Sequence, residues 1–138
     1  MIEERSAGAI LFSETPSGTV FLLLNYPSGH WDFVKGNMEN GESLRQTVVR
    51  EIKEETGISD VEFVEGFEDK IEYHYQRDRE RVHKQVVFFL AKTKTTDVKI
   101  SHEHLGFVWL GFDDALKKLT YKNAQNILKK VKKLCCKT

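Results

Sequence analysis

Three glutamates in this 138-residue chain are spaced in a way that suits metal chemistry. Glu51, Glu54 and Glu55 stand at i, i+3 and i+4, so a helix would bring their carboxylates together on one side. Like charges at this spacing destabilise an isolated helix by roughly 0.2 to 0.5 kcal/mol per pair, so the helix itself gives no reason to gather them. Gathered carboxylate oxygens are typical ligands of Mg²⁺ or Mn²⁺. The spacing therefore predicts a divalent-cation site. The alternative is a solvated acidic face whose charges pair with Arg50 and Lys53.

The segment that must present these carboxylates has the pattern of a helix. Between Ser43 and Thr56, the apolar residues Leu44, Val48 and Ile52 recur every four positions, as on one face of a helix. Gly57 follows directly and suits a helix C-terminus, because glycine accepts the left-handed conformation found there. The predicted helix places the glutamates at the border of its apolar stripe.

A longer pattern surrounds the glutamates. Gly36 is followed by five residues, then Glu42, then seven residues, and then the run from Arg50 to Ile58. Residues 36–58 resemble the Nudix box at all of its defining positions. These are Gly36, Glu42, Arg50, Glu51, Ile52, Glu54, Glu55, Gly57 and Ile58. The resemblance implies a hydrolase of a nucleoside diphosphate linked to another moiety, with a divalent metal held by the glutamates of the box.

Residues outside the box resemble one group of that family, the asymmetrical diadenosine tetraphosphate hydrolases. The resemblance covers most of the chain and includes His30-Trp31, Lys35-Gly36, the run from Ser101 to His104, and Trp109-Leu110. One position differs, because Val34 precedes Lys35 where the group usually has proline.

The resemblance implies roles for single residues around the metal. It places Mg²⁺ or Mn²⁺ at Glu51, Glu54, Glu55, Glu103 and Gly36. We expect Glu54 to be the general base, with Glu51, Glu55 and Lys35 as the other catalytic residues. Lys35 would neutralise the leaving phosphate, whereas Arg50 and Glu42 would fix the loop against the helix. His102 and His104 read as ordinary loop residues, because two histidines at this spacing with no third nitrogen or sulfur ligand are weak evidence for zinc.

A second set of residues is expected to bind the substrate. Tyr73 lies close in sequence to several cations, and aromatic faces stack bases while lysine and arginine neutralise phosphates. The alternative is a solvated hairpin with one tyrosine turned inward. The resemblance adds further contacts and a base sandwich. The expected substrate-binding residues are His30, Lys35, Tyr73, Lys84 and Tyr121.

Composition indicates one cytoplasmic domain spanning residues 1–138, which we expect to act as a monomer. The chain is 40% hydrophobic and 30% charged, with a formal net charge of zero. It has no apolar run near the roughly 18 residues of a membrane span, and its start lacks the apolar core of a signal peptide. After Asp114 every charged residue is a lysine. That end could attract a polyphosphate or an RNA 5′ end, or it could be the solvated face of a helix.

Hydrophobic patterns predict alternating strands and helices. Expected strands are Ala7–Phe12, Val20–Leu24, Val61–Phe67, Ile71–Tyr75, Val86–Leu90 and Phe107–Leu110, with a charged hairpin tip over Gln76–Lys84. Beyond the glutamate helix, we expect a short helix over about Asp113–Leu119. A longer one starts near Thr120, with an apolar stripe of Ala124, Ile127, Leu128, Val131 and Leu134. The pattern supports a mixed α/β fold, and the resemblance makes it a Nudix fold, a mixed sheet between helices.

The expected function is metal-dependent hydrolysis of a dinucleoside polyphosphate, with diadenosine tetraphosphate split to ATP and AMP. One alternative is a Nudix pyrophosphohydrolase acting on RNA 5′ ends, another nucleoside diphosphate derivative or a diphosphoinositol phosphate. Nucleic acid would then enter only as an RNA 5′ end. A second alternative is a non-catalytic nucleotide-binding module. The complete set of glutamates argues against this module.

Overall fold

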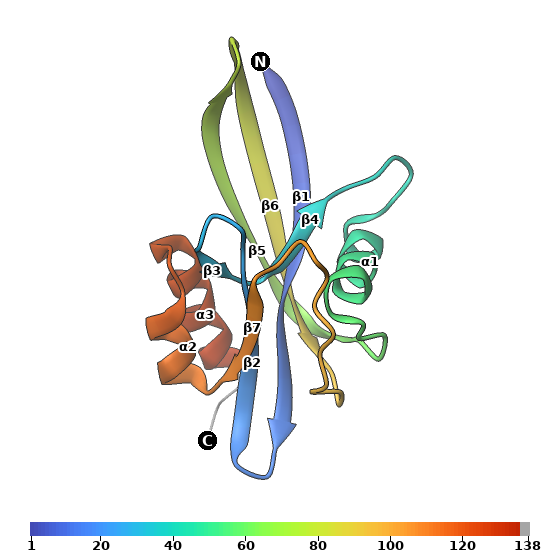
Figure 1. Cartoon of the computed structure of the whole chain (residues 1–138), viewed down its shortest axis with the longest axis vertical. Coiled ribbons are helices and arrows are strands. Elements are labelled where there is room, and N and C mark those ends of the chain that lie inside the picture. The colour runs from blue at the N-terminus through green and yellow to red at the C-terminus, as the bar shows by residue number, and fades with distance from the viewer. Residues whose placement is uncertain (136–138) are drawn as a thin grey trace.

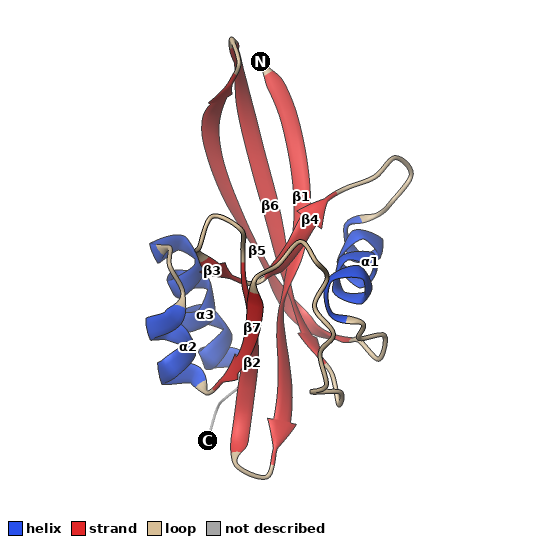
Figure 2. Ribbon diagram, in the orientation of Figure 1, coloured by secondary structure: helices blue, strands red, loops and turns tan. Residues whose placement is uncertain are grey.

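A mixed sheet lies between helices in the computed structural model of this protein, which describes residues 1–135 (Figure 1). Helix α1 covers one face of the sheet, and α2 and α3 cover the other (Figure 2). The strands are β1 (Ile2–Thr15), β2 (Gly18–Asn25), β3 (Trp31–Asp32), β4 (Val34–Asn37), β5 (Glu62–Arg77), β6 (Glu80–Lys92) and β7 (Gly106–Leu110). The helices are α1 (Leu44–Thr56), α2 (Phe112–Lys118) and α3 (Lys122–Cys135). This arrangement confirms the expected α/β fold.

The long strand β1 joins the parts of the sheet. The order of strands is β3-β2-β1-β6-β5, and β4 and β7 pair in addition with β1 and β2. Strands β1 and β6 are parallel, whereas the other pairs are antiparallel. Because β4 pairs with β1 through Ala7 and Gly36, the start of the glutamate segment is fixed to the centre of the sheet. Val34 is part of this strand, so the site of the usual proline forms regular sheet here.

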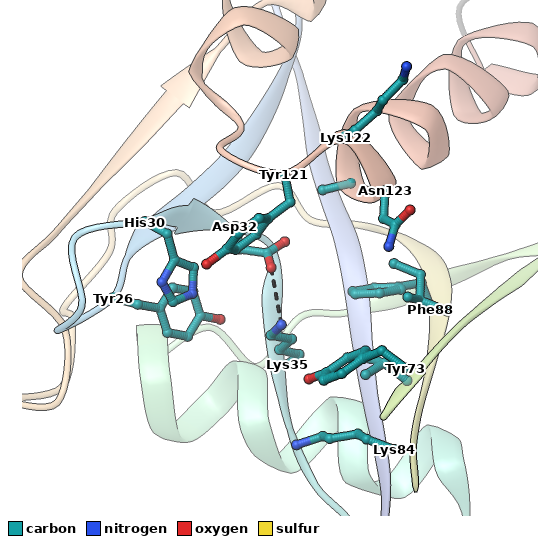
Figure 3. A pocket seen from close by; sticks show the side chains of 13 residues that line it. Tyr26, His30, Asp32, Lys35, Tyr73, Lys84, Phe88, Tyr121, Lys122 and Asn123 are labelled. Carbon is teal, nitrogen blue, oxygen red and sulfur yellow. Dashed lines mark ion pairs between the residues drawn. The ribbon is translucent and has the colours of Figure 1, made fainter. Parts of the chain in front are cut away.

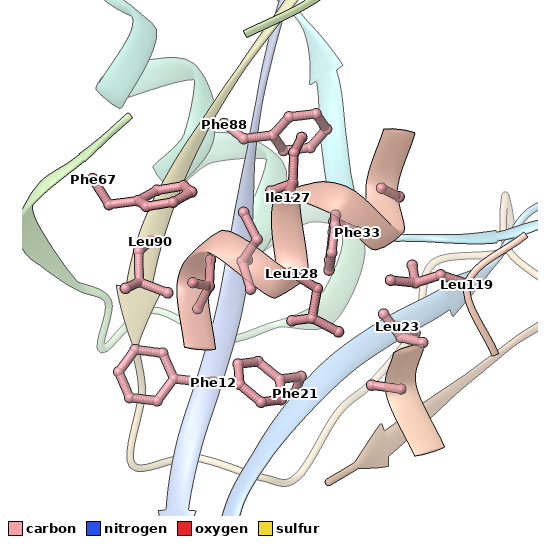
Figure 4. Packing of buried hydrophobic residues seen from close by; sticks show 14 of the residues in the cluster. Phe12, Phe21, Leu23, Phe33, Phe67, Phe88, Leu90, Leu119, Ile127 and Leu128 are labelled. Atoms are coloured by element: carbon pink, nitrogen blue, oxygen red, sulfur yellow. The ribbon is translucent and has the colours of Figure 1, made fainter. Parts of the chain in front are cut away.

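The central strands are buried on both faces, so alternate side chains enter two different cores. Ile10 and Phe12 of β1 pack toward α2 and α3, whereas Ala9 and Leu11 pack toward α1. Figure 4 shows the first core, where Phe33 and Phe88 meet edge to face with ring centroids 5.8 Å apart. Near-continuous apolar runs are what strands covered on both faces require.

Helix α1 confirms the predicted glutamate helix at both ends. Ser43 is its N-cap, and the Ser43 hydroxyl accepts a hydrogen bond from the backbone N–H of Gln46 while the Gln46 side chain accepts one from the Ser43 N–H. This reciprocal pair is a capping box. Gly57 ends the helix at φ 78°, and its N–H donates to the carbonyl of Lys53. Val48 and Ile52 of α1 are buried against the sheet, so the helix holds the carboxylates of Glu51 and Glu55 at the edge of this core.

Two expectations about the elements were wrong. The two expected strands, Val61–Phe67 and Ile71–Tyr75, are not separate but merge into β5, which begins at Glu62 and continues through an irregularity between Phe63 and Glu68. Gly66, at φ 95°, absorbs the distortion, so pairing with β6 resumes beyond it. Leu134 is not part of the buried stripe, because the core against α3 ends at Val131 and Leu134 is 46% exposed.

The charged segment between β5 and β6 is a hairpin tip, as expected, but most of it is strand. Pairing continues to Arg77 and Glu80, which leaves Asp78 and Arg79 as the turn. Asp78 adopts φ 55°, a conformation that aspartate tolerates in tight turns. Lys84 consequently belongs to β6 and faces the same space as Tyr73 of β5.

The chain's late lysines lie on exposed faces of α2 and α3, which fits a solvated helix surface. Lys137 lies outside the described residues. None of the helices in residues 1–135 is long and apolar enough to cross a membrane.

Candidate active site

Two neighbouring cavities open beside β4, and Tyr26 and Lys35 line both of them. We call the larger one, of about 730 Å³, the carboxylate cavity, because Glu51, Glu55 and Glu103 line it. We call the other, of about 640 Å³, the aromatic cavity, because rings including Tyr73 and Tyr121 line it. The two cavities together contain most of the residues singled out from the sequence.

The carboxylate cavity is built by three elements that come together around Gly36. Strand β4 contributes Lys35 and Gly36, α1 contributes Glu51 and Glu55, and the loop before β7 contributes Glu103. A Cβ atom at position 36 would overlap the carboxylate of Glu51, so a side chain there would push Glu51 out of the site. Glycine at position 36 therefore leaves room for the Glu51 carboxylate in its present place.

The carboxyl group of Glu51 has a raised pKa in the carboxylate cavity. Its side chain is 12% exposed, and desolvation raises the pKa of its carboxyl, although the Arg50 guanidinium opposes that change. Glu55 and Glu54 raise the same pKa further through repulsion. A cation bound by Glu51 would offset the cost of burying its charge and would reduce the repulsion from Glu54 and Glu55.

Arg50 connects the acidic groups around the helix. Its Nη1 donates to Glu51 at 2.7 Å and to Glu54 at 2.8 Å, and its Nε donates to Glu42 at 2.6 Å. Its Nη2 donates to the backbone carbonyl of Asn37 at 2.9 Å, which confirms that Arg50 and Glu42 fix the loop against α1. The Arg50 guanidinium lowers the pKa of Glu42 to about 2.

Glu54 lies at the edge of the site. Its side chain is 55% exposed and pairs with Arg50, and it is not among the residues that line the carboxylate cavity. Of Glu51, Glu54 and Glu55, it is the one most open to solvent.

Glu55 is held from the loop before β7. The Ser101 hydroxyl donates to Glu55 Oε2 at 2.8 Å, and Nδ1 of His104 lies 2.5 Å from the same oxygen. The interpretation of His104 as an ordinary loop residue was wrong, because its side chain is 6% exposed and pairs with a box glutamate. The alternating Ser-His-Glu-His pattern signalled a special loop, but only the folded chain shows which histidine turns inward.

The acidic residues of the carboxylate cavity fit a divalent cation in chemical type. Glu51, Glu55 and Glu103 supply hard oxygen ligands to one cavity, next to the backbone of Gly36. Within residues 1–135, no three His, Cys, Asp or Glu side chains are arranged to ligate one ion. Arg50 contacts Oε2 of Glu51, and His104 contacts Oε2 of Glu55, so an ion bound there would share these carboxylates with their present partners.

The aromatic cavity gathers all the residues assigned to substrate binding. These residues are His30, Lys35, Tyr73, Lys84 and Tyr121. Figure 3 shows that they come from separate parts of the chain and surround one space. Its floor is apolar, with Val86 and Phe88 from β6. Tyr73 and Tyr121 are 40% and 52% exposed, so both rings present open faces.

Two lysines give the aromatic cavity a positive side. Lys35 pairs with the buried Asp32 at 3.1 Å, and Lys84 donates to Asn37 Oδ1 at 3.2 Å. Burial lowers the pKa of Lys84, and the nearby Lys35 lowers it further, whereas Glu4 opposes the change. An anion placed between the two lysines would offset their mutual repulsion.

Tyr26 lies between the cavities and was missed as a site residue. Its ring stacks on His30 at 4.8 Å and meets the edge of His104 at 4.6 Å, and His30 in turn lies 5.3 Å from Tyr121. Its hydroxyl donates to the carbonyl of Phe33 at 2.5 Å, and burial raises its pKa. The rings of Tyr26 and His30 thus form a continuous row between His104, which contacts Glu55, and Tyr121, which lines the aromatic cavity. In the sequence, Tyr26 is only an aromatic residue before a Pro-Ser-Gly turn.

Comparison with known proteins identifies the family. The family model described as the NUDIX domain matches residues 3–131, and the chain belongs to this family and is a Nudix hydrolase. It is 35% identical to the pig protein called bis(5′-nucleosyl)-tetraphosphatase [asymmetrical] over 122 residues, which cover 84% of this chain and 80% of that protein. It is 31% identical to the mouse protein of the same name, with 97% of each chain covered.

A solved structure has the same fold over nearly the whole chain. It is a Caenorhabditis elegans Ap4A hydrolase in a binary complex, with a TM-score of 0.84 and 30% identity. The match covers 96% of this chain and 98% of that one. The fold is therefore that of an Ap4A hydrolase structure.

Proposed function

We propose that this Nudix hydrolase splits diadenosine tetraphosphate into ATP and AMP, using Mg²⁺. The observation that carries the proposal is the pairing of two cavities: an aromatic one with a lysine side, directly beside one lined by Glu51, Glu55 and Glu103. Relatives named asymmetrical bis(5′-nucleosyl)-tetraphosphatase cover most of the chain, which supports the same substrate.

In this proposal the aromatic cavity binds one adenosine. Tyr73 and Tyr121 stack on the base, an interaction worth roughly 1 to 3 kcal/mol per stacked base. The phosphates leave the cavity past Lys84 and Lys35 and reach the carboxylates, because Lys35 lines both cavities. His30, stacked on Tyr26, closes the side of the aromatic cavity that faces the loop between β2 and β3.

The remaining residues act on the phosphate chain. Glu51, Glu55, Glu103 and the backbone of Gly36 would hold a divalent ion, which would offset phosphate charge and lower the pKa of water. Lys35 neutralises the leaving phosphate. Glu54 is the proposed base, because its exposed carboxylate is open to water. Arg50 and Glu42 keep the loop in place, and Ser101 and His104 orient Glu55.

Tyr73 and Tyr121, which we call the adenosine clamp, would determine which bond of the phosphate chain is hydrolysed. The phosphorus atoms of the substrate are chemically similar, so the position of the chain decides which of them is attacked. We also propose that the protein works as a monomer.

A product assay over a small panel of nucleotides tests this function. Diadenosine tetraphosphate, a triphosphorylated RNA, an oxidised nucleotide and a diphosphoinositol phosphate are each incubated with the protein and Mg²⁺. We expect ATP and AMP in equal amounts from the first and much slower turnover of the others. Formation of two ADP, or rapid release of pyrophosphate from the RNA with the dinucleotide left intact, would overturn the proposal. Nucleotide binding without any turnover would point to a non-catalytic module.

A further inference from the structure

Asn37, the last residue of β4, contacts a cation from each of the two cavities. Its side-chain Oδ1 accepts a hydrogen bond from Nζ of Lys84 at 3.2 Å, and Lys84 lines the aromatic cavity. Its backbone carbonyl accepts one from Nη2 of Arg50 at 2.9 Å, and Arg50 lines the carboxylate cavity, as Asn37 itself does. Asn37 therefore lies beside the path that a phosphate chain would take from one cavity into the other.

The side-chain carboxamide of Asn37 is held in one orientation. Besides Lys84, the Ser6 hydroxyl donates to Oδ1 at 2.7 Å, and Ser6 is buried opposite Asn37 in the β1–β4 register. A lysine ammonium can only donate hydrogen bonds, so the atom that faces it must be the carboxamide oxygen. Within residues 1–135, the two N–H groups of Nδ2 donate to no protein atom. Because Asn37 is exposed and lines the carboxylate cavity, these donors are open to a ligand there.

We propose that Nδ2 of Asn37 donates a hydrogen bond to a phosphate oxygen of the substrate, while Oδ1 holds the Lys84 ammonium next to the same phosphate group. The carboxamide is neutral, so it fixes Lys84 without cancelling the charge that attracts phosphate. A carboxylate in this place would pair with Lys84 and repel phosphate. Hydrogen bonds to a charged group contribute more than those between neutral groups. The inference rests on the proposed function for the phosphate chain that passes between the cavities.

Two substitutions in the full-length protein, with one control, separate this hydrogen bond from its alternatives. Asn37→Asp keeps an acceptor for Ser6 and Lys84, so the buried hydroxyl stays paired, but it removes the donor and adds a negative charge. Asn37→Ala removes the donor and adds no charge. Asn40→Asp is the matched control, because Asn40 is exposed in the turn after β4 and lines neither cavity.

The first measurement is binding of ATP and of adenosine without metal, by calorimetry. We expect Asn37→Ala to weaken ATP binding at least about tenfold and Asn37→Asp to weaken it further, with adenosine binding unchanged in both. Asn40→Asp should bind both ligands as the parent does. Parent-like ATP binding in Asn37→Ala overturns the proposal, because any loss in Asn37→Asp is then repulsion alone. An equal loss of ATP and adenosine binding also overturns it.

A second comparison separates direct contact with phosphate from placement of Lys84. In protein that carries Lys84→Met, the further change Asn37→Ala should still weaken ATP binding at least about threefold. No further loss would show that Asn37 acts only by placing Lys84, and it overturns the hydrogen bond to phosphate.

The last measurement is hydrolysis of diadenosine tetraphosphate across a Mg²⁺ titration. Asn37→Ala should raise KM at least about tenfold. The Mg²⁺ concentration at half-maximal rate should stay at the parent value, because the backbone carbonyl that accepts from Arg50 is unchanged. A changed Mg²⁺ requirement with an unchanged KM overturns the proposal, since it indicates a disturbed β4 and no lost contact with phosphate.

These measurements also separate the inference from the proposed function. Selective loss of ATP binding in Asn37→Ala, in a protein that does not hydrolyse diadenosine tetraphosphate, overturns the proposed function and supports the contact of Asn37 with phosphate. Hydrolysis to ATP and AMP with parent-like KM and ATP binding in Asn37→Ala overturns only the role of Asn37.

Discussion

The carboxylate cavity and the aromatic cavity are neighbours, but they are held together by different forces. In the carboxylate cavity, Glu51 and Glu55 are fixed by ion pairs and hydrogen bonds to Arg50, Ser101 and His104. The aromatic cavity is shaped by packed strands and rings over an apolar floor. A metal ion would bind carboxylates that already have charged or polar partners in the first, whereas a base enters an already formed space in the second. A substitution of a carboxylate in the carboxylate cavity should therefore lower turnover without changing nucleotide binding, and a substitution in the aromatic cavity should do the reverse.

The largest effect is expected from Glu55→Gln. Glutamine keeps the size of the side chain and can still accept from Ser101, but it loses the charge that would hold the ion. Because even outer partners of metal ligands change activity by about 10- to 100-fold, we expect turnover to fall at least about a hundredfold. Binding of ADP without metal should stay at the parent value. Parent-like turnover would remove Glu55 from the metal site, and lost ADP binding would show that the cavities are not independent.

A smaller loss is expected from Glu103→Gln, which lies far from the other carboxylates in sequence. Turnover should fall at least about tenfold, which corresponds to about 1.4 kcal/mol in the barrier, and more Mg²⁺ should be needed for half-maximal rate. Steady-state kinetics across a metal titration measures both. Unchanged kinetics over the whole titration would remove Glu103 from the site.

Tyr73→Leu tests the other cavity. Loss of one stacking face should raise KM about tenfold, within the roughly 1 to 3 kcal/mol of a stacked base, and leave the Mg²⁺ dependence unchanged. The matched control is Tyr75→Leu, because Tyr75 lies on the same strand outside both cavities. If Tyr73→Leu changed the metal dependence and left KM alone, the assignment of the two cavities would be reversed.

The smallest effect concerns the pH dependence of stability near the carboxylate cavity. Arg50 lowers the pKa of Glu42 to about 2 in the folded protein, below its ordinary value of 4.5. Glu42 therefore stabilises the fold above pH 4.5, and this contribution is lost as the pH falls from 4.5 toward 2. In Glu42→Gln, the fall of Tm across this window should be shallower than in the parent. Identical slopes in thermal melts would show that the Glu42–Arg50 pair contributes no pH-dependent stability.

The sequence was informative where the site is local and silent where it is assembled from distant segments. Residues 36–58 form one continuous pattern, so the spacing of Glu51, Glu54 and Glu55 could be interpreted before folding. Helix α1 and its caps followed from the same stretch, because a capping serine and a terminal glycine act locally. Tyr121 was predicted to bind substrate only through the resemblance, since it lies beside Tyr73 of β5 only when α3 packs on the sheet.

Contacts between distant loops could not be predicted from local pattern. His104 reaches Glu55 and meets the ring of Tyr26 edge to face because the loop before β7 folds back over α1. No periodicity in the sequence distinguishes this histidine from His102. The continuity of β5 was missed for a similar reason, because the irregularity at Gly66 looks like a break until its pairing with β6 is seen.

The most direct test of the account is hydrolysis of diadenosine tetraphosphate in heavy-oxygen water, followed by mass measurement of the products. If the aromatic cavity holds one adenosine and thereby places a single phosphorus atom for attack, the label should appear in AMP and the ATP should be unlabelled. The same pattern should persist in Tyr75→Leu and weaken in Tyr73→Leu. Label in ATP, or two molecules of ADP as products, would contradict the claim that the clamp selects the bond.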